Sequence, residues 1–144
     1  MKGVGKFGEV MAGEKGEVEI DVVLEKLRRV IRSGSQSKAI FDFVLKELRR
    51  SFARYAWAGV YMVEGEELVL KAWSGPHATQ HLRIPIGEGI CGLAARTGET
   101  VVVPILRDGI AIGEIDIDSD ALEAFSEEDR AFLEALADEL AKVL

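Results

Sequence analysis

Two stretches in the middle of the chain consist of strand-forming residues that fold back on themselves. "WAGVYMV" and "ELVLKAW" are separated by "EGE", and "TVVVPIL" and "IAIGEIDID" are separated by "RDG". Short connections that contain glycine, placed between two such runs, are typical of β-hairpins. "HLRIPI" adds one more strand-like run between the two pairs. The chain is therefore expected to build a sheet mostly from antiparallel hairpins.

Helical periodicity flanks these strands on both sides. Apolar residues recur at spacings of three and four after Asp21, and again after Ser37 and after Ser126. These three residues are types that favour the N-cap of a helix, and Gly34 is expected to end the first helix. Helices at both ends of a hairpin-built sheet favour an α+β fold, with the terminal helices on one face of an antiparallel sheet. The other face would then be free to hold a ligand.

The composition indicates one folded domain. The chain has 144 residues, of which 48% are hydrophobic, which is enough for a single core. We expect residues 1–19, rich in glycine, lysine and glutamate, to form a flexible arm, and residues 20–144 to form the domain. The net charge of −7 argues against nucleic-acid and anionic-membrane binding. One cysteine, with no signal-peptide or transmembrane pattern, predicts a cytoplasmic protein.

Three carboxylates alternate with isoleucine near the end of the last strand-like run. Glu114, Asp116 and Asp118 share one face of a strand, and the isoleucines between them share the other. Before Gly113 the apolar residues Ile110 and Ile112 occupy the alternate positions that the carboxylates occupy after it. This change near Gly113 predicts a bulge or bend there. The carboxylates form either a solvated outer face or an acidic wall of a pocket, and the pattern alone favours neither.

A glycine-rich segment, "GEGICG", follows the third strand-like run and carries the only cysteine, Cys91. Its spacing matches a dinucleotide-binding turn, but the full β-α-β unit that such a site requires is missing. A tight turn before a short helix is the simpler interpretation. Cys91 would lie in the first turn of that helix, where a thiolate is favoured, so it is either a nucleophile or a small packing residue.

Two further pairs of residues are candidates for a site. His77 and His81 have a spacing found in metal sites, but "GPHATQH" is not helical in pattern and no further ligands accompany them, so no metal is expected. Trp57 and Tyr61 lie on the same face of one strand. They are either ordinary core residues or the aromatic wall of a small-molecule pocket.

Four segments together resemble a GAF domain, and within that family the free methionine-(R)-sulfoxide reductases. They are "WAGVYMVEGEELVLKAWSG", "LRIPIGEGICGLAARTGET", "IAIGEIDIDS" and "FSEEDRAFLEALADEL". The resemblance covers roughly Leu24 to Leu144. It implies a GAF-like antiparallel sheet with the N- and C-terminal helices packed on one face and a ligand pocket on the other.

The resemblance also implies roles for particular residues. Trp57 and Tyr61 match aromatic residues that wall the family's substrate pocket. Asp116 and Asp118 match carboxylates that help to bind the substrate and its reacting group. Cys91 matches the cysteine of the family's glycine-rich turn, which makes it the candidate catalytic residue.

One departure from the family lies after Thr100. Members of the family place a second strand and a long loop there, and that loop carries the principal catalytic cysteine. In this chain the single strand-like run in "TGETVVVPILRDG" connects the glycine-rich segment to the Asp-Gly hairpin turn without such a loop. Either the protein lacks the loop, or loop residues are missing from the sequence at a hidden break, which we expect between Thr100 and Ile105.

The expected function is binding of a small polar ligand, with thiol-dependent reduction of free methionine-R-sulfoxide if the loop exists. A thioredoxin-like reductant would then be the partner, no cofactor is expected, and a homodimer is predicted from the apolar stripe of the first helix. The alternatives are a non-catalytic small-molecule sensor and a dimerisation module. One cysteine cannot both attack a sulfoxide and resolve the product within the chain.

Overall fold

The computed structural model describes residues 12–79, 81–86, 99–121 and 125–144. The helices are α1 (Ala12–Ile31), α2 (Ser37–Ser51) and α4 (Glu127–Ala141). The strands are β1 (Trp57–Glu64), β2 (Glu67–Ser74), β3 (Arg83–Pro85), β4 (Glu99–Arg107) and β5 (Ile110–Ser119). None of these three helices has the length and apolar character needed to cross a membrane.

The strands form one antiparallel sheet in the order β3-β2-β1-β5-β4. Both predicted hairpins are present, β1 with β2 and β4 with β5. The second hairpin turns at Asp108 and Gly109, whose φ angles are 53° and 80°. Positive φ at both central residues is the geometry that makes Asp-Gly a favoured hairpin turn.

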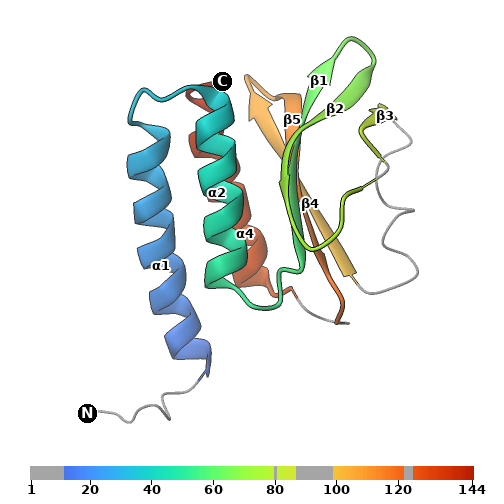
Figure 1. The fold of residues 1–144 in the computed structure, drawn as a ribbon. Coiled ribbons are helices and arrows are strands. Elements are labelled where there is room, and N and C mark those ends of the chain that lie inside the picture. Colours follow the sequence, from blue (N-terminus) through green and yellow to red (C-terminus); the bar gives the residue numbers. More distant parts are fainter. Residues whose placement is uncertain (1–11, 80, 87–98, 122–124) are drawn as a thin grey trace.

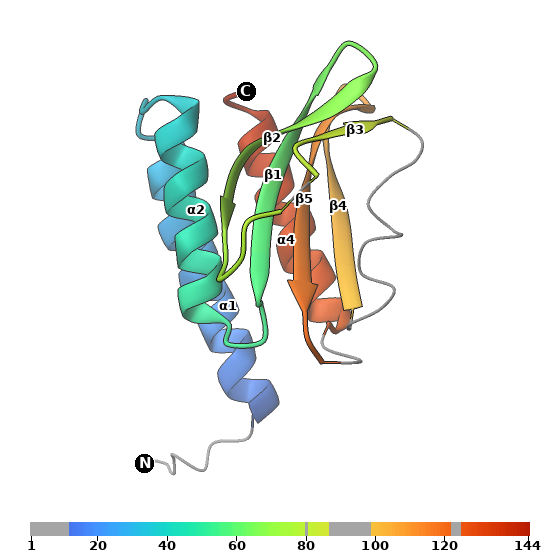
Figure 2. The ribbon, with the colours of Figure 1, turned by 45° about the vertical axis from the view of Figure 1, so that its right-hand side comes forward.

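The helices all lie on one face of the sheet (Figures 1 and 2). In Figure 1, α2 and α4 lie between α1 and the sheet, and α1 packs against both of them. The α+β prediction is therefore confirmed. The main core fills the space between the helices and the sheet, and its fully buried side chains include Leu27, Val44, Leu48, Val60, Val103, Ile115, Ile117, Leu133 and Leu136.

The predicted bulge in β5 is also present. Pairing between β4 and β5 shifts where Ile105 lies opposite Gly113 and Leu106 lies opposite Ala111. The shift lets Ile112 pack against the helix-side core that also contains Ile115 and Ile117. Ile112 and Ile115 are three residues apart, a spacing that would place them on opposite faces of a regular strand. The bulge therefore allows both to pack in one core.

Two predicted helix starts are wrong, and one is confirmed. α1 begins at Ala12, nine residues before the predicted N-cap Asp21, so part of the expected arm is helical. The N-cap of α2 is Gln36, which makes no side-chain capping bond. Ser126 does cap α4, and it forms a capping box in which its side chain and that of Asp129 each accept a backbone N–H. The division into an arm and a domain at residue 20 stays a prediction.

Strand β4 crosses the region of the expected break without interruption. Each residue from Glu99 to Ile105 is paired with successive residues of β5, from Ser119 back to Gly113. The predicted break between Thr100 and Ile105 is therefore wrong. The direct connection through one strand, without an inserted loop, is a property of this fold. Among the described strands β4 is the last of the sheet at this side, and Pro104 lies near its middle.

Helix α1 is attached to the other two helices by buried carboxylates. Glu139 of α4 accepts hydrogen bonds from Arg28 (3.0 Å from Nε) and Arg32 (3.0 Å from the terminal nitrogen) of α1. Glu47 of α2 accepts one from Lys26 of α1 at 3.3 Å. Both carboxylates are buried, so each needs these cationic partners to offset the loss of hydration.

Candidate functional site

The face of the sheet opposite the helices carries the predicted site residues. Their neighbours in the strands, Ala58 and Val60 in β1 and Ile115 and Ile117 in β5, point into the helix-side core. Strand geometry therefore turns the residues between them to the other face. Across the β1–β5 pair, three positions lie directly opposite one another: Trp57 and Asp118, Gly59 and Asp116, and Tyr61 and Glu114.

Tyr61 is fixed on this face. Its side chain is 1% exposed and packs in a small cluster with Leu68 and Ile84. Its hydroxyl donates a hydrogen bond to the carbonyl oxygen of His81 at 2.9 Å. Burial raises the pKa of the Tyr61 phenol well above its usual range, and the charges of the three carboxylates on β5 raise it further. The phenol therefore stays neutral and lies within the field of those carboxylates.

Trp57 lies flat against the sheet because two glycines leave room for it. A Cβ atom at Gly59 would come within 2.4 Å of the far edge of the indole, and one at Gly75 would come within 2.4 Å of Cδ1. The ring of Trp73 is nearly parallel to that of Trp57, with centroids 6.4 Å apart. The indole therefore forms an aromatic wall beside the position of Asp116.

The two aspartates differ in their surroundings. Asp116 is only 1% exposed, which contradicts the interpretation of the carboxylates as a solvated outer face. Asp118 is half-buried and accepts a hydrogen bond of 2.6 Å from the hydroxyl of Thr100 on β4. Burial raises the pKa of the Asp118 carboxyl, the Thr100 hydrogen bond opposes that rise, and the charge of Asp120 adds to it.

Glu114 is the third carboxylate of this face. Its side chain is half-buried, and within the described part of the chain its Oε2 atom is buried without a hydrogen-bond partner. Together with the aromatic wall, these carboxylates suit a small molecule that carries an ammonium group, because carboxylates and aromatic faces both attract cations. Whether Asp116 and Asp118 line a cavity stays a prediction.

Sequence reasoning missed two contributors to this face. The hydrogen bond between Thr100 and Asp118 was not predicted, although the expected β4–β5 hairpin brings these two residues opposite each other. Gly59 is the second contributor. It lies between Trp57 and Tyr61 on the same face of β1, and a glycine in this position of a strand indicates that a neighbouring ring packs against the backbone.

The remaining candidates are Cys91 and the two histidines. Cys91 falls among residues 87–98, outside the described residues, so its role stays a prediction. His81 is involved through its backbone carbonyl rather than its imidazole. Among the residues that the structure describes, no three histidine, cysteine or acidic side chains are grouped so that they could hold a metal ion.

The known proteins similar to this chain include GAF domain proteins and free methionine-R-sulfoxide reductases. No protein-family model matches the chain. The GAF domain-containing protein A of Dictyostelium discoideum is 28% identical, over 87% of this chain and 91% of its own length. The free methionine-R-sulfoxide reductase of Escherichia coli is 33% identical, over 61% of this chain and 66% of its own length.

Solved structures agree with these relatives. The free methionine-R-sulfoxide reductase of Neisseria meningitidis, in complex with its substrate, matches with a TM-score of 0.73 and 31% identity, covering 85% of this chain and 86% of that one. A putative GAF sensor protein of Burkholderia vietnamiensis matches with a TM-score of 0.76 and 28% identity, covering 88% and 94%. The chain belongs to the GAF domain family, and within that family it is similar to the free methionine-R-sulfoxide reductases.

Proposed function

We propose that this protein binds free methionine-R-sulfoxide, or a closely similar amino acid, on the face of the sheet opposite the helices. The observation that carries the proposal is the pairing of β1 with β5, which places Trp57 opposite Asp118 and Tyr61 opposite Glu114, with Asp116 opposite Gly59 between them. The similar protein of Neisseria meningitidis was solved with its substrate bound, which supports a ligand of this class.

Each group on this face has a role that its chemistry suits. The buried Asp116 would attract the ammonium group of the amino acid, and Trp57 would contact its sulfur and methyl group, since sulfur packs well against aromatic rings. Asp118 has a pKa above its ordinary value, so it would donate a hydrogen bond to the sulfoxide oxygen more readily than an ordinary aspartate. Tyr61, held by His81, would shape the other end of the ligand.

Reduction of the ligand would need the thiol of Cys91. Its thiolate would attack the sulfoxide sulfur, and transfer of the oxygen with one proton would leave methionine and a cysteine sulfenic acid. Two thiols from an external thioredoxin-like reductant would then convert the sulfenic acid back to the thiol, forming their own disulfide and water. An external reductant is required because Cys91 is the only cysteine of the chain.

A second candidate function is a small-molecule sensor that binds the same ligand without turning it over. The uninterrupted course of β4 from Glu99 to Arg107 favours it, because the family resemblance places the principal catalytic cysteine on a loop that would interrupt this region. The third candidate, a dimerisation module, would use the apolar surface of α1 and would not need the ligand face.

One set of titrations separates these functions. Free L-methionine-R-sulfoxide is titrated into the full chain by calorimetry, alongside the S epimer and the N-acetylated R-sulfoxide, which lacks the ammonium group. NADPH consumption is then followed with thioredoxin, thioredoxin reductase and the R-sulfoxide. Binding with turnover supports the reductase, and saturable binding without turnover supports the sensor. No heat of binding with any of the three compounds would leave only the dimerisation module.

Replacing Asp118 with asparagine is expected to weaken binding of the R-sulfoxide about tenfold, because an amide N–H is a weaker donor to the sulfoxide oxygen than a carboxyl O–H. Stability should change little. Since the folded-state pKa of Asp118 is raised, its ionisation destabilises the fold as pH rises through that range, and asparagine removes this penalty. Calorimetry and urea denaturation measure the two effects. The exposed Asp138→Asn on α4 is the matched control, and equal affinities of both variants would remove Asp118 from the site.

A homodimer formed through α1 is the assembly we propose. Val22 is 61% exposed on this helix. A groove between α1 and α4 is lined by apolar side chains and two carboxylates, namely Ile20, Leu24, Ala131, Phe132, Ala135, Asp21 and Glu128. Pairing of two copies would cover this apolar surface. Light scattering at micromolar concentration should give twice the monomer mass, and Val22→Asp should shift the protein to the monomer. A monomeric wild-type protein under these conditions would refute the dimer.

A further inference from the structure

A second cleft lies on the helix side of the sheet, away from Trp57 and Asp116. It has a volume of about 460 Å³ and is formed by the start of α2, strands β1 and β2, and the last residues of the chain. Seven residues line it: Ser37, Lys38, Phe41, Met62, Lys71, Val143 and Leu144. The volume lies within the range of about 300 to 1,000 Å³ that is usual for small-molecule sites.

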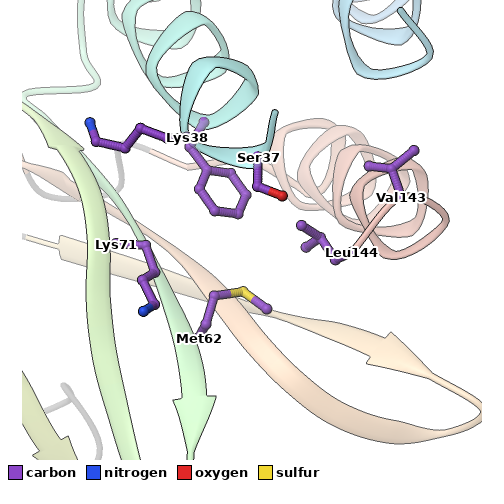
Figure 3. Close-up of a pocket in the computed structure, with 7 residues that line it drawn as sticks. Ser37, Lys38, Met62, Lys71, Val143 and Leu144 are labelled. Atoms are coloured by element: carbon purple, nitrogen blue, oxygen red, sulfur yellow. The ribbon is translucent and has the colours of Figure 1, made fainter. Parts of the chain in front are cut away.

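The lining of this cleft is polar at one side and apolar at the other. In Figure 3 the side chains of Lys38 and Lys71 lie at the left with their nitrogen atoms pointing in different directions, Met62 lies at the lower centre, and Leu144 and Val143 lie at the right. The ring of Phe41, which is buried, belongs to the same lining. A ligand that fits this arrangement has a charged end and an apolar end, since each would meet the matching part of the wall.

The start of α2 adds to the positive side. The first N–H groups of a helix have no acceptor within the helix and carry partial positive charge. In this helix of 15 residues the N-cap Gln36 makes no side-chain capping bond, and the first turn contains no acidic residue. The Ser37 side chain at this end points into the cleft in Figure 3. The head group of a ligand would therefore meet donors and positive charge.

Both lysines already have carboxylate partners, but these ion pairs are expected to contribute little to stability. The Lys38 ammonium is 2.9 Å from Asp42, four residues along the same helix, and Lys71 is paired with Glu64. The two pairs are partly exposed, and exposed ion pairs contribute little to stability. An ammonium group has three donors, so each lysine can bind a ligand anion while it keeps its partner.

We propose that this cleft binds a small amphipathic anion, with one anionic head group held by Lys38, Lys71 and the start of α2 and a short acyl or aryl tail over Phe41 and Met62. This site is independent of the sulfoxide proposal, because Met62 packs against the helix-side core whereas Trp57 and Tyr61 lie on the other face of the sheet.

The methyl group of Met62 provides a local probe. The chain has three methionines, so methyl-labelled protein gives few resonances, and Met62→Leu assigns the one that matters. Titration with octanoate is expected to shift the Met62 resonance to saturation. Octylammonium has the same tail with the opposite charge, and it should bind at least about tenfold more weakly.

Variants test the head-group contacts separately. Lys71→Met and Lys38→Met keep the length of the side chain and remove the charge, and each should weaken octanoate binding about tenfold. Lys46→Met, an exposed position on the same helix outside the cleft, should leave the affinity unchanged. The proposal is overturned if octanoate leaves the Met62 resonance in place, or if octylammonium binds wild-type protein equally well, a result that needs no variant to fold.

Discussion

Replacing Asp129 with alanine is expected to lower the free energy of unfolding by about 3 kcal/mol, because a capping box is lost and a buried phenol loses its acceptor. Asp129 is 1% exposed. Its Oδ1 accepts hydrogen bonds of 2.5 Å from the Tyr55 hydroxyl and from Arg54, and its Oδ2 accepts the backbone N–H of Ser126 at 2.8 Å. Urea denaturation measures the loss. Asp138→Ala, an exposed position on the same helix, should cost less than about 0.5 kcal/mol.

The same carboxylate should make stability depend on pH. Burial raises the pKa of Asp129, but hydrogen bonds from Tyr55 and Ser126, with the charge of Arg54, outweigh it and hold the pKa below its ordinary value. The stability it adds is therefore fully present above the unfolded-state pKa of about 3.9 and is lost as pH falls through the lower folded-state pKa. The difference between wild type and Asp129→Ala should shrink below about pH 4. A constant difference down to the acid transition would contradict this account.

Replacing Cys91 with serine is expected to abolish any turnover of free methionine-R-sulfoxide. Serine is not a nucleophile toward sulfoxide sulfur under these conditions, and no other thiol exists in the chain. Binding should persist, because the proposed ligand contacts are made by Trp57, Tyr61 and the aspartates. NADPH consumption with thioredoxin and thioredoxin reductase measures turnover, and calorimetry measures binding.

Two outcomes would change the assignment. Turnover by Cys91→Ser at the wild-type rate would mean that activity comes from a contaminating reductase. Absence of turnover in both wild type and variant, with binding retained, would support the sensor over the reductase. Labelling of the thiol with iodoacetamide as pH is varied gives a further check, since a thiol at a helix N-terminus should react below its ordinary pKa of about 8.5.

Local patterns were enough to predict the hairpins of the sheet and which residues share the face opposite the helices. Asp108-Gly109 predicted a hairpin turn, and the change of parity at Gly113 predicted a bulge. The alternation of carboxylates with Ile115 and Ile117 predicted opposite faces, and the structure places the isoleucines in the core. These features depend on residues that are close in sequence, so the sequence determines them directly.

Features that depend on distant partners could not be predicted in this way. Glu139 looks like any solvent-facing residue of an amphipathic helix, yet it is buried because Arg28 and Arg32, more than 100 residues earlier, supply its partners. The same holds for Asp129, whose partner Tyr55 lies 74 residues away. The early start of α1 at Ala12 was missed because Gly13 and Gly16 have low helix propensity. The contact of Thr100 with Asp118 was missed because a break was expected between Thr100 and Ile105, although the predicted hairpin pairs these two strands.

The uninterrupted strand β4 also bears on how the molecule avoids association through its sheet. As the last described strand on its side, β4 presents one row of backbone groups that do not pair with β5, and such a row can recruit a strand from another molecule. Pro104, exposed near the middle of the strand, has no N–H group to offer, and a regular ladder across it would lose a bond. Pro104 thus disfavours edge-to-edge association along this described edge of the sheet.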